Sequence, residues 1–336
     1  MSKEQRRLSS TNGADGKESR EVDGTKLSTH PLFDGIEMGL GTWAWGDRLV
    51  WGYGKSHNAS DVVDAFDVSV KAGIRLLDTA EIYGQGKSER HIGDLLREKP
   101  DNAVLVASKF MPFPWRLGKG SFERALRNSL KRLGMNKLDL YQIHFPLPPG
   151  NVRVWMSWMS EAVKQGLVGA VGVSNFNLDQ TRTAYEALVR DGYSLASNQV
   201  EYHLLDRRIE KNGLLDLCFQ LGIKVIAYSP LAMGMLTGKY TPENPPSGHR
   251  QQKYNREFLM RIKPLLDGLR QIGEDRGGKT PAQVALNWTI CKGTLPIPGA
   301  KNGHQAEMNA GALGWRLTSS EMDRLDDLSD KVTSAK

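Results

Sequence analysis

Short apolar runs alternate with longer segments of helical period along most of this chain, and this alternation limits the folds that it can adopt. Eight runs have the length and apolar content of buried strands, namely residues 36–40, 74–77, 103–107, 138–143, 168–173, 196–200, 223–228 and 294–297. Continuous apolar strands separated by helices predict a parallel sheet with helices over it. Eight such units predict an α/β protein of the closed (β/α)8 kind, the TIM barrel. An open, doubly wound sheet is the alternative.

Capping residues predict where the helices between these strands begin. We expect helices to start after Asn58 or Ser60, after Ser88 and after Ser121, because each precedes a segment of helical period. Residues 210–222 read as one further helix between two strands. Strand and helix therefore alternate throughout, as a barrel requires.

Residues 1–26 differ in composition from the rest of the chain. They contain almost no large apolar side chains and mix Lys, Arg, Ser and Gly with acidic residues. Such a segment cannot bury enough apolar surface to offset the entropy lost on ordering, so we predict a disordered tail. It lacks the apolar stretch of a secretory signal and is too acidic for a transit peptide, although it fits the remnant of one. Residues 27–336 are predicted to form one barrel domain.

The charge and the cysteine content exclude several classes of partner. The net charge is +7, but the basic residues are scattered among 38 acids, which favours an anionic small ligand over nucleic acid. No stretch approaches the roughly 18 apolar residues of a membrane span, so we predict no membrane segment. Cys218 and Cys291 form no CxxC pair, and the histidines show no HExxH spacing. We therefore predict no metal.

A glycine motif near the first strand must be weighed against the barrel. Gly39 and Gly41 begin a match to the dinucleotide fingerprint GxGxxG/A, and Asp61 lies about 20 residues further on. Trp43 and Trp45 argue against that interpretation, because the turn must let a pyrophosphate approach bare backbone and then enter a helix at once. The fingerprint therefore gives the open sheet little support.

Polar residues follow the predicted strands one after another. They are Asp78 with Tyr83, Lys109, His144, Ser174 with Asn175, Gln199, and Tyr228 with Ser229. Taken singly, each residue can be explained by a structural role without a catalytic function, such as a helix cap, a surface lysine or a core histidine. In a barrel, however, the residues after each strand gather at the rim where the catalytic groups of this fold lie. Together they predict an active site.

Four of these residues suggest proton donation to a carbonyl oxygen. A free phenol titrates near ~10, and an ammonium within about 4–6 Å lowers that pKa. We therefore predict that Lys109 lowers the pKa of Tyr83, that Asp78 holds Lys109 in place, and that His144 orients a bound carbonyl. Such a site also needs a source of hydride.

Seven ordered blocks resemble those of the aldo-keto reductase superfamily, and the resemblance covers about residues 32–328. They are GIRLLDTAEIYG (73–84), VASKF (106–110), LGMNKLDLYQIHFP (133–146), VGVSNF (171–176), NQVEYHLLDR (198–207), IAYSPLAMGMLTGKY (226–240) and PIPGAKNGHQAEMNAGALGWRL (296–317). GTWAWG at 41–46, PWRL at 114–117 and GALGWRLT at 311–318 are most similar to chloroplast-type plant and algal members. The resemblance implies a chloroplast location, and otherwise a cytoplasmic one.

The resemblance also implies NADPH as cofactor and a catalytic tetrad of Asp78, Tyr83, Lys109 and His144. The residues that it assigns to the cofactor are Gly41, Thr42, Trp43, Ser174, Asn175, Gln199, Tyr228, Ser229, Pro230, Leu231, Gly234, Leu236, Lys239, Arg250, Ile297, Gly299, Ala300, Lys301, Gln305 and Asn309. Among them, Ser174, Asn175 and Gln199 would hold the carboxamide, and Tyr228 would stack on the nicotinamide. Lys301 would face the ribose 2′-phosphate, which favours NADPH over NADH.

The substrate pocket is expected from a loop rich in aromatic residues. Residues 45–57 lie between the first strand and the first helix, and we predict that Trp45, Trp51 and Tyr53 shape the pocket. Phe145 stands where many relatives of the resembled family carry Trp, so it is assigned to the pocket as well. The alternative is that these aromatic residues only pack on the barrel.

The expected activity is NADPH-dependent reduction of an aldehyde or ketone to the alcohol, with the proton from Tyr83. The expected partner is a small carbonyl substrate, and the expected state is a monomer or weak homo-oligomer. Some members of the resembled family are potassium-channel β subunits, which bind NADPH and act chiefly as regulatory partners. That reading is the alternative, but no partner-binding segment is recognisable and the four tetrad residues are all present.

Overall fold

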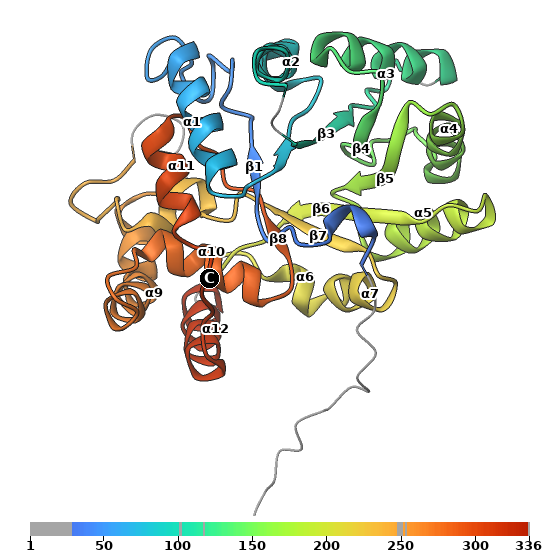
Figure 1. The fold of residues 1–336 in the computed structure, drawn as a ribbon. Helices are drawn as coiled ribbons and strands as arrows, with labels where there is room; N and C mark the ends of the chain where they lie inside the picture. The colour runs from blue at the N-terminus through green and yellow to red at the C-terminus, as the bar shows by residue number, and fades with distance from the viewer. Residues whose placement is uncertain (1–28, 101–102, 117, 247–250, 253, 335–336) are drawn as a thin grey trace, which may run out of the picture.

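A ring of strands surrounded by helices forms the body of the protein in the computed structural model (Figure 1). The structure describes residues 29–100, 103–116, 118–246, 251–252 and 254–334. The predicted tail of residues 1–26 and the predicted cofactor residue Arg250 lie outside these described residues.

The eight predicted strands are all present, and they form one parallel sheet in the order of the chain. They are β1 (Gly39–Gly41), β2 (Leu76–Asp78), β3 (Leu105–Phe110), β4 (Leu138–Ile143), β5 (Val168–Ser174), β6 (Leu195–Glu201), β7 (Lys224–Tyr228) and β8 (Leu295–Pro296). A bridge between Gly41 and Gly299 completes the ring, and the N–H of Gly41 donates to the carbonyl of Pro298 at 3.0 Å. A Cβ on Gly41 would lie 2.8 Å from the carbonyl oxygen of Ile297, so the closure needs glycine there.

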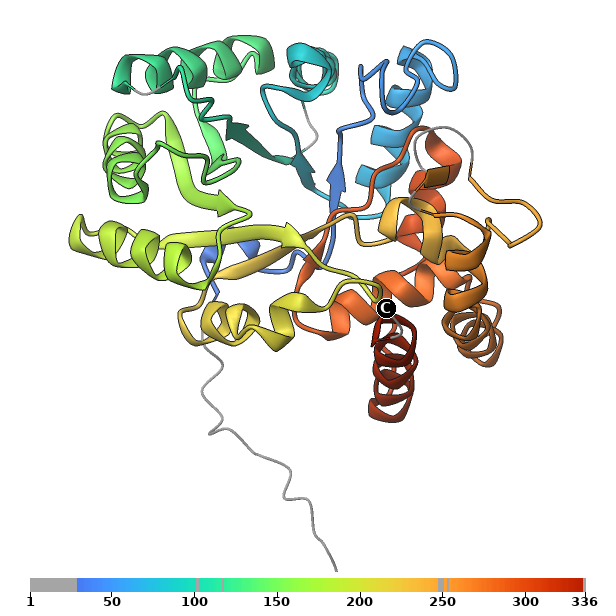
Figure 2. The same cartoon turned by 180° about the vertical axis from the view of Figure 1, so that it is seen from behind.

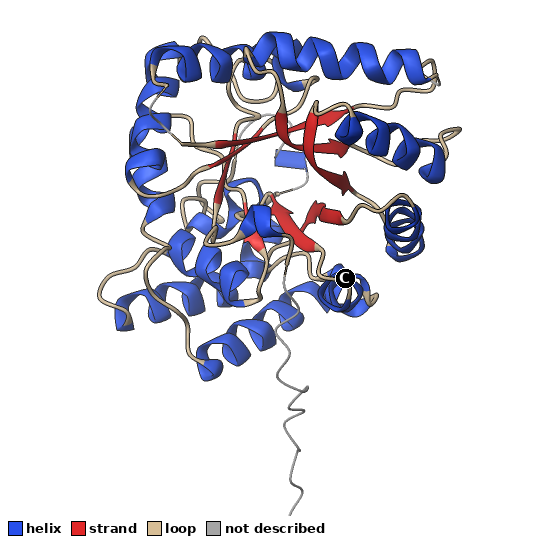
Figure 3. Ribbon diagram, turned by 45° about the vertical axis from the view of Figure 1, so that its right-hand side comes forward, coloured by secondary structure: helices blue, strands red, loops and turns tan. Residues whose placement is uncertain are grey.

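Helices cover the outside of this ring on every side (Figures 2 and 3). The α-helices are α1 (Ala59–Lys71), α2 (Lys87–Glu98), α3 (Lys119–Leu133), α4 (Val152–Lys164), α5 (Leu178–Arg190), α6 (Arg208–Lys211), α7 (Leu214–Gln220), α9 (Arg256–Asp275), α10 (Pro281–Cys291), α11 (Gly303–Ala310) and α12 (Ser319–Ser334). The 3₁₀ helices are η1 (Pro31–Phe33), η2 (Tyr83–Gly86) and η3 (Ala232–Thr237). The arrangement is the (β/α)8 barrel that the alternation predicts.

Two of the predicted helix starts are wrong and one is confirmed. Asn58 caps α1 as predicted, because its side chain accepts from the N–H of Ser60 and a reciprocal capping box is present. Ser88 lies inside α2, which begins after Gly86 in the left-handed region, and its buried hydroxyl instead donates to the carbonyl of Thr42. Likewise, α3 begins two residues before Ser121.

The predicted helix over residues 210–222 is in fact two short helices. Gly213 separates α6 from α7 and adopts a left-handed φ of 79°, which only glycine accepts without strain. The helical period continues across this break in the sequence, so the pattern alone does not reveal it.

The apolar core has two parts, one inside the ring and one between the ring and the helices. The inner cluster takes a side chain from β2 to β8 in turn, with Phe33 of η1 against it: Leu76, Ala107, Leu140, Ala170, Ala196, Ile226 and Leu295. The interior is therefore packed, and the space for chemistry is left at the carboxyl ends of the strands.

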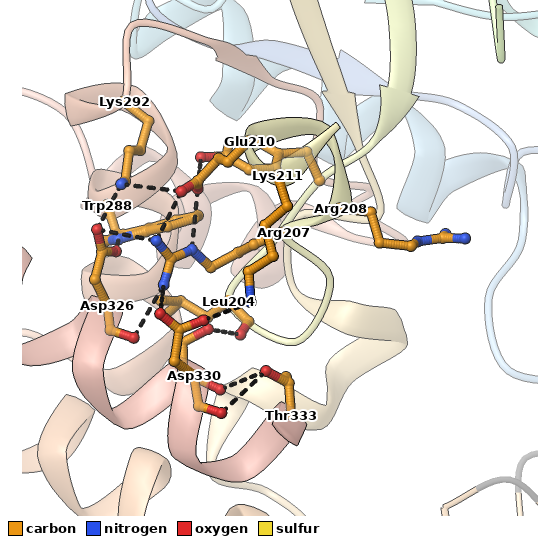
Figure 4. A network of polar contacts seen from close by, with 12 residues as sticks. Leu204, Arg207, Arg208, Glu210, Lys211, Trp288, Lys292, Asp326, Asp330 and Thr333 are labelled. Atoms are coloured by element: carbon orange, nitrogen blue, oxygen red, sulfur yellow. Dashed lines mark hydrogen bonds and ion pairs between the residues drawn. The ribbon is translucent and has the colours of Figure 1, made fainter. Parts of the chain in front are cut away.

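A polar cluster fastens the C-terminal helix to the barrel (Figure 4). The guanidinium of Arg207 contacts Glu210 of α6 at 2.7 Å and Asp326 of α12 at 3.1 Å. Lys292, which follows α10, contacts the same carboxylate of Asp326 at 2.6 Å. The indole N–H of Trp288 in α10 donates to Asp326 at 2.8 Å. Three helices far apart in the chain thus share one network of opposite charges.

Candidate active site

The four predicted catalytic residues meet at the carboxyl end of the barrel. Asp78 is the last residue of β2, Lys109 lies one residue before the end of β3, and His144 directly follows β4. Tyr83 begins η2, the turn between β2 and α2. Because neighbouring parallel strands end at the same rim, these side chains come together without any insertion in the barrel.

The ammonium group of Lys109 forms hydrogen bonds to three neighbouring residues of the site. It donates to Oδ1 of Asp78 at 2.6 Å, to the carbonyl of Thr79 at 2.8 Å and to the hydroxyl of Tyr83 at 3.4 Å. Both members of the ion pair are buried, with side-chain exposures of 0% for Lys109 and 3% for Asp78. Burial alone lowers the pKa of Lys109, but the charge of Asp78 and the hydrogen bonds to Asp78 and Tyr83 raise it above its ordinary value. Lys109 therefore stays charged.

The phenol of Tyr83 differs from the prediction in the sign of its pKa shift. Burial raises the pKa of Tyr83, the charge of Lys109 opposes that rise, and the net pKa lies above the ordinary value of a tyrosine. The predicted lowering by Lys109 is real as a contribution, but burial outweighs it in the free protein. Tyr83 is therefore protonated at neutral pH and can act only as a proton donor there.

The imidazole of His144 lies edge-on to Tyr83, with 5.8 Å between the ring centroids. Burial and then the positive charge of Lys109 hold the pKa of His144 well below its usual range. The ring is therefore neutral at pH 7 and can donate one hydrogen bond. Its Nδ1 is buried and has no hydrogen-bond partner among the described residues. Such an unpaired group is rare inside a protein and is typical of a site that binds a polar ligand.

The second oxygen of Asp78 accepts from two glutamine side chains. Gln199 of β6 donates to Oδ2 at 2.7 Å, and Gln142 of β4 donates at 3.4 Å. Gln142 also accepts from the hydroxyl of Ser197 at 3.5 Å. Gln142 has no predicted role, because the sequence alone does not show that a polar residue within an apolar strand faces the inside of the ring. Its place beside the tetrad makes it part of the site.

The residues predicted to hold the carboxamide form a connected chain across β5, β6 and β7. The hydroxyl of Ser174 donates to the carbonyl of Gln199 at 2.9 Å and accepts from Nδ2 of Asn175 at 3.0 Å. Asn175 also donates to the carbonyl of His144 at 3.1 Å and accepts from the hydroxyl of Tyr228 at 3.0 Å. The chain therefore links the predicted nicotinamide platform to the histidine of the tetrad.

Unfavourable backbone conformations gather at the same rim. The described residues other than glycine that have a left-handed φ are Gln85, Asn175, Ser229, Ala232 and Met233. They follow β2, β5 and β7, and three of them lie in the segment after β7, which contains several of the residues assigned to the cofactor. Such residues persist only where the surroundings hold them, and they are concentrated at binding sites. The irregular backbone after β7 is consistent with an anion-binding turn.

Aromatic rings form one wall beside Tyr83. Trp43 stacks on Tyr83 with 5.9 Å between centroids, and Trp51 meets Trp43 edge-on at 5.5 Å. The predicted cofactor residue Trp43 thus contacts the proton donor. Trp45 differs from its predicted place in the pocket: it is fully buried, and its indole N–H donates to the carbonyl of Ala300 at 2.9 Å. Its ring therefore packs inside the protein, where it has no exposed surface to offer a substrate.

The other two predicted pocket residues lie on different sides of the site. Phe145 stacks on His144 with 5.1 Å between centroids, so it lies next to the tetrad. Tyr53 packs against His57 at 5.3 Å and against His91 of α2 at 5.2 Å. No ring contact joins Tyr53 to the tetrad within the described part of the chain, so it braces the loop against α2.

Lys301, predicted to face the 2′-phosphate, contacts the aromatic loop. Its ammonium donates to the carbonyl of Trp51 at 2.7 Å and to the hydroxyl of Ser56 at 3.3 Å, and it lies 5.4 Å from the Trp51 ring. Its backbone N–H donates to Oε1 of Gln305 at 3.0 Å. The residue predicted to bind the phosphate is thus tied to the loop that carries Trp51.

The remaining residues assigned to the cofactor lie after β1, β7 and β8 on the same rim. Those with little exposed side-chain surface are Thr42, Pro230, Leu236, Ile297, Ala300 and Asn309. Those with more exposed surface are Ser229, Leu231, Gly234, Lys239 and Gln305. Gly41 and Gly299 form the bridge that closes the ring.

Most of the chain is similar to one known protein family. The model of the aldo/keto reductase family matches residues 37–330. The chain belongs to the aldo/keto reductase family. As a member of this family it is an NADP-dependent oxidoreductase. The described residues contain no helix that is long and apolar enough to cross a membrane and no cluster of side chains suited to a metal ion.

Several members of the family are similar over most of their length. The chloroplastic pyridoxal reductase of Arabidopsis thaliana is 42% identical over 86% of this chain and 82% of its own. An uncharacterized oxidoreductase of Mycobacterium tuberculosis is 40% identical over 88% of this chain and 90% of its own. The solved structure of an aldo-keto reductase from Klebsiella pneumoniae in complex with NADPH is 31% identical, covers 87% of this chain and 90% of its own, and has a TM-score of 0.68.

Proposed function

We propose that this aldo/keto reductase uses NADPH to reduce a small aldehyde or ketone to the alcohol, and that Tyr83 supplies the proton. The observation that carries the proposal is the series that runs from the buried pair of Asp78 and Lys109 to the half-buried Tyr83, with 2.6 Å and 3.4 Å between the polar atoms. A neutral histidine lies edge-on to the same phenol. A phenol, an ammonium and a neutral imidazole at one rim are suited to polarising and protonating a carbonyl oxygen.

The residues of the rim fit the proposed cofactor. NADPH would supply the hydride when bound. Tyr228 offers a half-buried ring whose hydroxyl is fixed by Asn175, which suits it to stack on a planar nicotinamide. The left-handed backbone at Ser229, Ala232 and Met233 suits the pyrophosphate, because successive N–H groups in such turns converge on an anion. Lys301 would grip the 2′-phosphate.

The proton path uses groups that are already in place. Tyr83 donates its proton to the carbonyl oxygen as the alcohol forms, and the ammonium of Lys109 stabilises the phenolate that is left. Asp78 keeps Lys109 charged, and Gln199 and Gln142 hold the carboxylate of Asp78 in place by donating to its other oxygen. His144 would donate a hydrogen bond to the same carbonyl oxygen and so fix its position.

The wall of the site favours a substrate with a flat apolar part. Trp43, Trp51 and Phe145 present aromatic rings beside Tyr83 and His144. The relative from Arabidopsis is named a pyridoxal reductase, and pyridoxal is an aldehyde on an aromatic ring. We therefore propose aromatic aldehydes, including pyridoxal, as the first substrates to test. The name of that relative also supports a chloroplast location for this protein, and a monomer or weak homo-oligomer stays our prediction.

The experiment is a screen of aldehydes and ketones that follows NADPH absorbance, with the Tyr83→Phe protein as control. We expect turnover of at least one aldehyde, and we expect Tyr83→Phe to lose it while its NADPH affinity is retained. NADPH binding without turnover across the panel, and unchanged by Tyr83→Phe, would instead favour the regulatory role known from potassium-channel β subunits.

A further inference from the structure

Outside the tetrad, one carboxylate joins two loops of the rim. Glu81 lies between Asp78 and Tyr83 in the segment that follows β2. Its Oε1 accepts from the backbone N–H of Met111 at 2.7 Å and from Nη1 of Arg116 at 2.7 Å. Its Oε2 accepts from Nη2 of Arg116 at 3.2 Å. Both oxygens of Glu81 are thus used to hold the loop that follows β3.

The side chain of Arg116 is held by further contacts besides those with Glu81. Besides its two contacts with Glu81, its Nη1 donates to the carbonyl of Met111 at 2.9 Å, and its guanidinium lies 4.6 Å from the ring of Phe110. The side chains of Arg116 and Glu81 are 19% and 11% exposed. A planar guanidinium that meets a carboxylate with two parallel hydrogen bonds fixes distance and angle together, which a lysine in its place does not do.

The two loops that this pair joins carry different parts of the proposed reaction. The segment after β2 carries Tyr83. The loop after β3, residues 111–116, continues the strand that carries Lys109. It also presents Phe113 and Trp115, whose rings stack with 4.8 Å between centroids, and Trp115 is 76% exposed. The pair therefore joins the segment that carries Tyr83 to the loop that carries these aromatic rings.

The segment before η2 is held to β3 by two backbone hydrogen bonds, from Thr79 to Ala107 at 2.8 Å and from Glu81 to Lys109 at 3.5 Å. Tyr83 itself contacts Lys109, Trp43 and His144, but the backbone of η2 is irregular. No side chain caps η2, and Gly84 and Gln85 within it have left-handed φ values of 54° and 58°. The N–H of Tyr83 donates to the carbonyl of Ala80 at 3.0 Å, a contact inside the same turn. A turn of this kind moves easily unless a neighbouring segment holds it.

We propose that Glu81 and Arg116 are positioning residues for the proton transfer: their ion pair fixes the turn of Tyr83 against the loop after β3, and so sets the phenol against Lys109. The proposal rests on the proposed function, because it concerns the same proton. A displacement of about 1 Å at a reacting group can cost about a hundredfold in rate, so a pair that touches neither substrate nor cofactor can still control turnover.

The test compares Glu81→Gln, Arg116→Met and the double variant with wild type and with Arg276→Met. Arg276 is a matched control, because its guanidinium also donates two hydrogen bonds to one carboxylate, that of Glu321, at 2.8 Å and 2.5 Å, and this pair joins the end of α9 to α12 rather than the loops after β2 and β3. For each protein we would measure the melting temperature, the Kd for NADPH by fluorescence, and kcat and KM for an aldehyde that wild type reduces.

We expect each single variant to lower kcat at least about tenfold with the NADPH Kd within about twofold of wild type. The double variant should be no slower than the slower single variant, because the pair acts as a unit. Arg276→Met should lower the melting temperature and leave kcat unchanged. Variants of Glu81 and Arg116 that lose melting temperature but keep wild-type kcat would overturn the proposal. Wild type that reduces no aldehyde would overturn the proposed function instead.

Discussion

The side-chain amide of Gln199 lies 2.7 Å from Oδ2 of Asp78, so a residue assigned to the nicotinamide carboxamide also holds the buried carboxylate of the tetrad. Lys109 occupies the other oxygen of the same carboxylate at 2.6 Å. In the proposed function, one hydrogen-bonded unit would thus serve both the binding of the cofactor and the transfer of the proton.

We expect Asp78→Asn to be more damaging than its size suggests. The change keeps the shape of the side chain but leaves the ammonium of Lys109 buried without a counter-ion. Breaking such a pair costs about 3 kcal/mol or more of unfolding free energy, and we expect kcat to fall about a hundredfold. Gln199→Leu is the matched control, because it keeps the ion pair and should cost much less. Denaturant unfolding and steady-state kinetics check both, and equal losses in the two variants would contradict this account.

The pH dependence of reduction follows from the directions of the pKa shifts. His144 has its pKa held well below 6.5 and is neutral above that value, whereas Tyr83 has its pKa raised above 10 and stays protonated below it. We therefore expect kcat/KM for reduction to be level over roughly pH 7 to 9 and to fall only as the pH rises further. A fall within that window would mean that the charge of Lys109 outweighs burial in setting the pKa of Tyr83 once the cofactor is bound.

We expect Lys301→Met to weaken the binding of NADPH much more than the binding of NADH. A charge-assisted contact to a phosphate contributes about 1.5–3 kcal/mol, so the Kd for NADPH should rise about tenfold to a hundredfold while that for NADH changes little. The matched control is Lys55→Met, which removes an exposed lysine from the aromatic loop. Fluorescence titration with both cofactors measures the effect, and an equal loss for NADPH and NADH would count against the assignment of Lys301 to the 2′-phosphate.

The polar cluster at the C-terminal helix can be tested for its contribution to stability by substitutions outside the candidate active site. Arg207→Met removes the cation shared by Glu210 and Asp326, and we expect a loss of about 3 kcal/mol in unfolding free energy. Arg208→Met is the control, because the neighbouring side chain is 77% exposed and pairs with Asp206, so its loss should stay below about 1 kcal/mol. Denaturant unfolding compares the two variants, and a similar effect in both would show that the cluster contributes little.

The sequence predicted the strands well and the helix boundaries less well. All eight apolar runs became strands, because a strand buried on both faces has little choice of residue. Ser88 has the chemistry of a cap but lies inside α2, where its hydroxyl bonds to Thr42, and no local pattern distinguishes those two uses. The helices α9 and α12 were not predicted.

For the candidate site, the sequence predicted which residues gather at the rim but not how their side chains are oriented. Asp78, Lys109 and His144 were found because they end neighbouring strands, and that position is readable from sequence. The orientation of an aromatic ring cannot be predicted from the sequence. The buried ring of Trp45 donates to the carbonyl of Ala300, whereas Trp43 stacks on Tyr83. The sign of the Tyr83 pKa shift was also out of reach, because it depends on a balance between burial and one distance to Lys109.

Because the strands follow one another around the ring in chain order, the two halves of the reaction are encoded one after the other. Asp78, Lys109 and His144 come from β2, β3 and β4, whereas most residues assigned to the cofactor follow β5 to β8. A hybrid joined between β4 and β5 would inherit its proton chemistry from one parent and most of its nucleotide preference from the other. Recombination within the family should therefore be able to change the preferred nucleotide cofactor while the proposed proton donor, Tyr83, is kept.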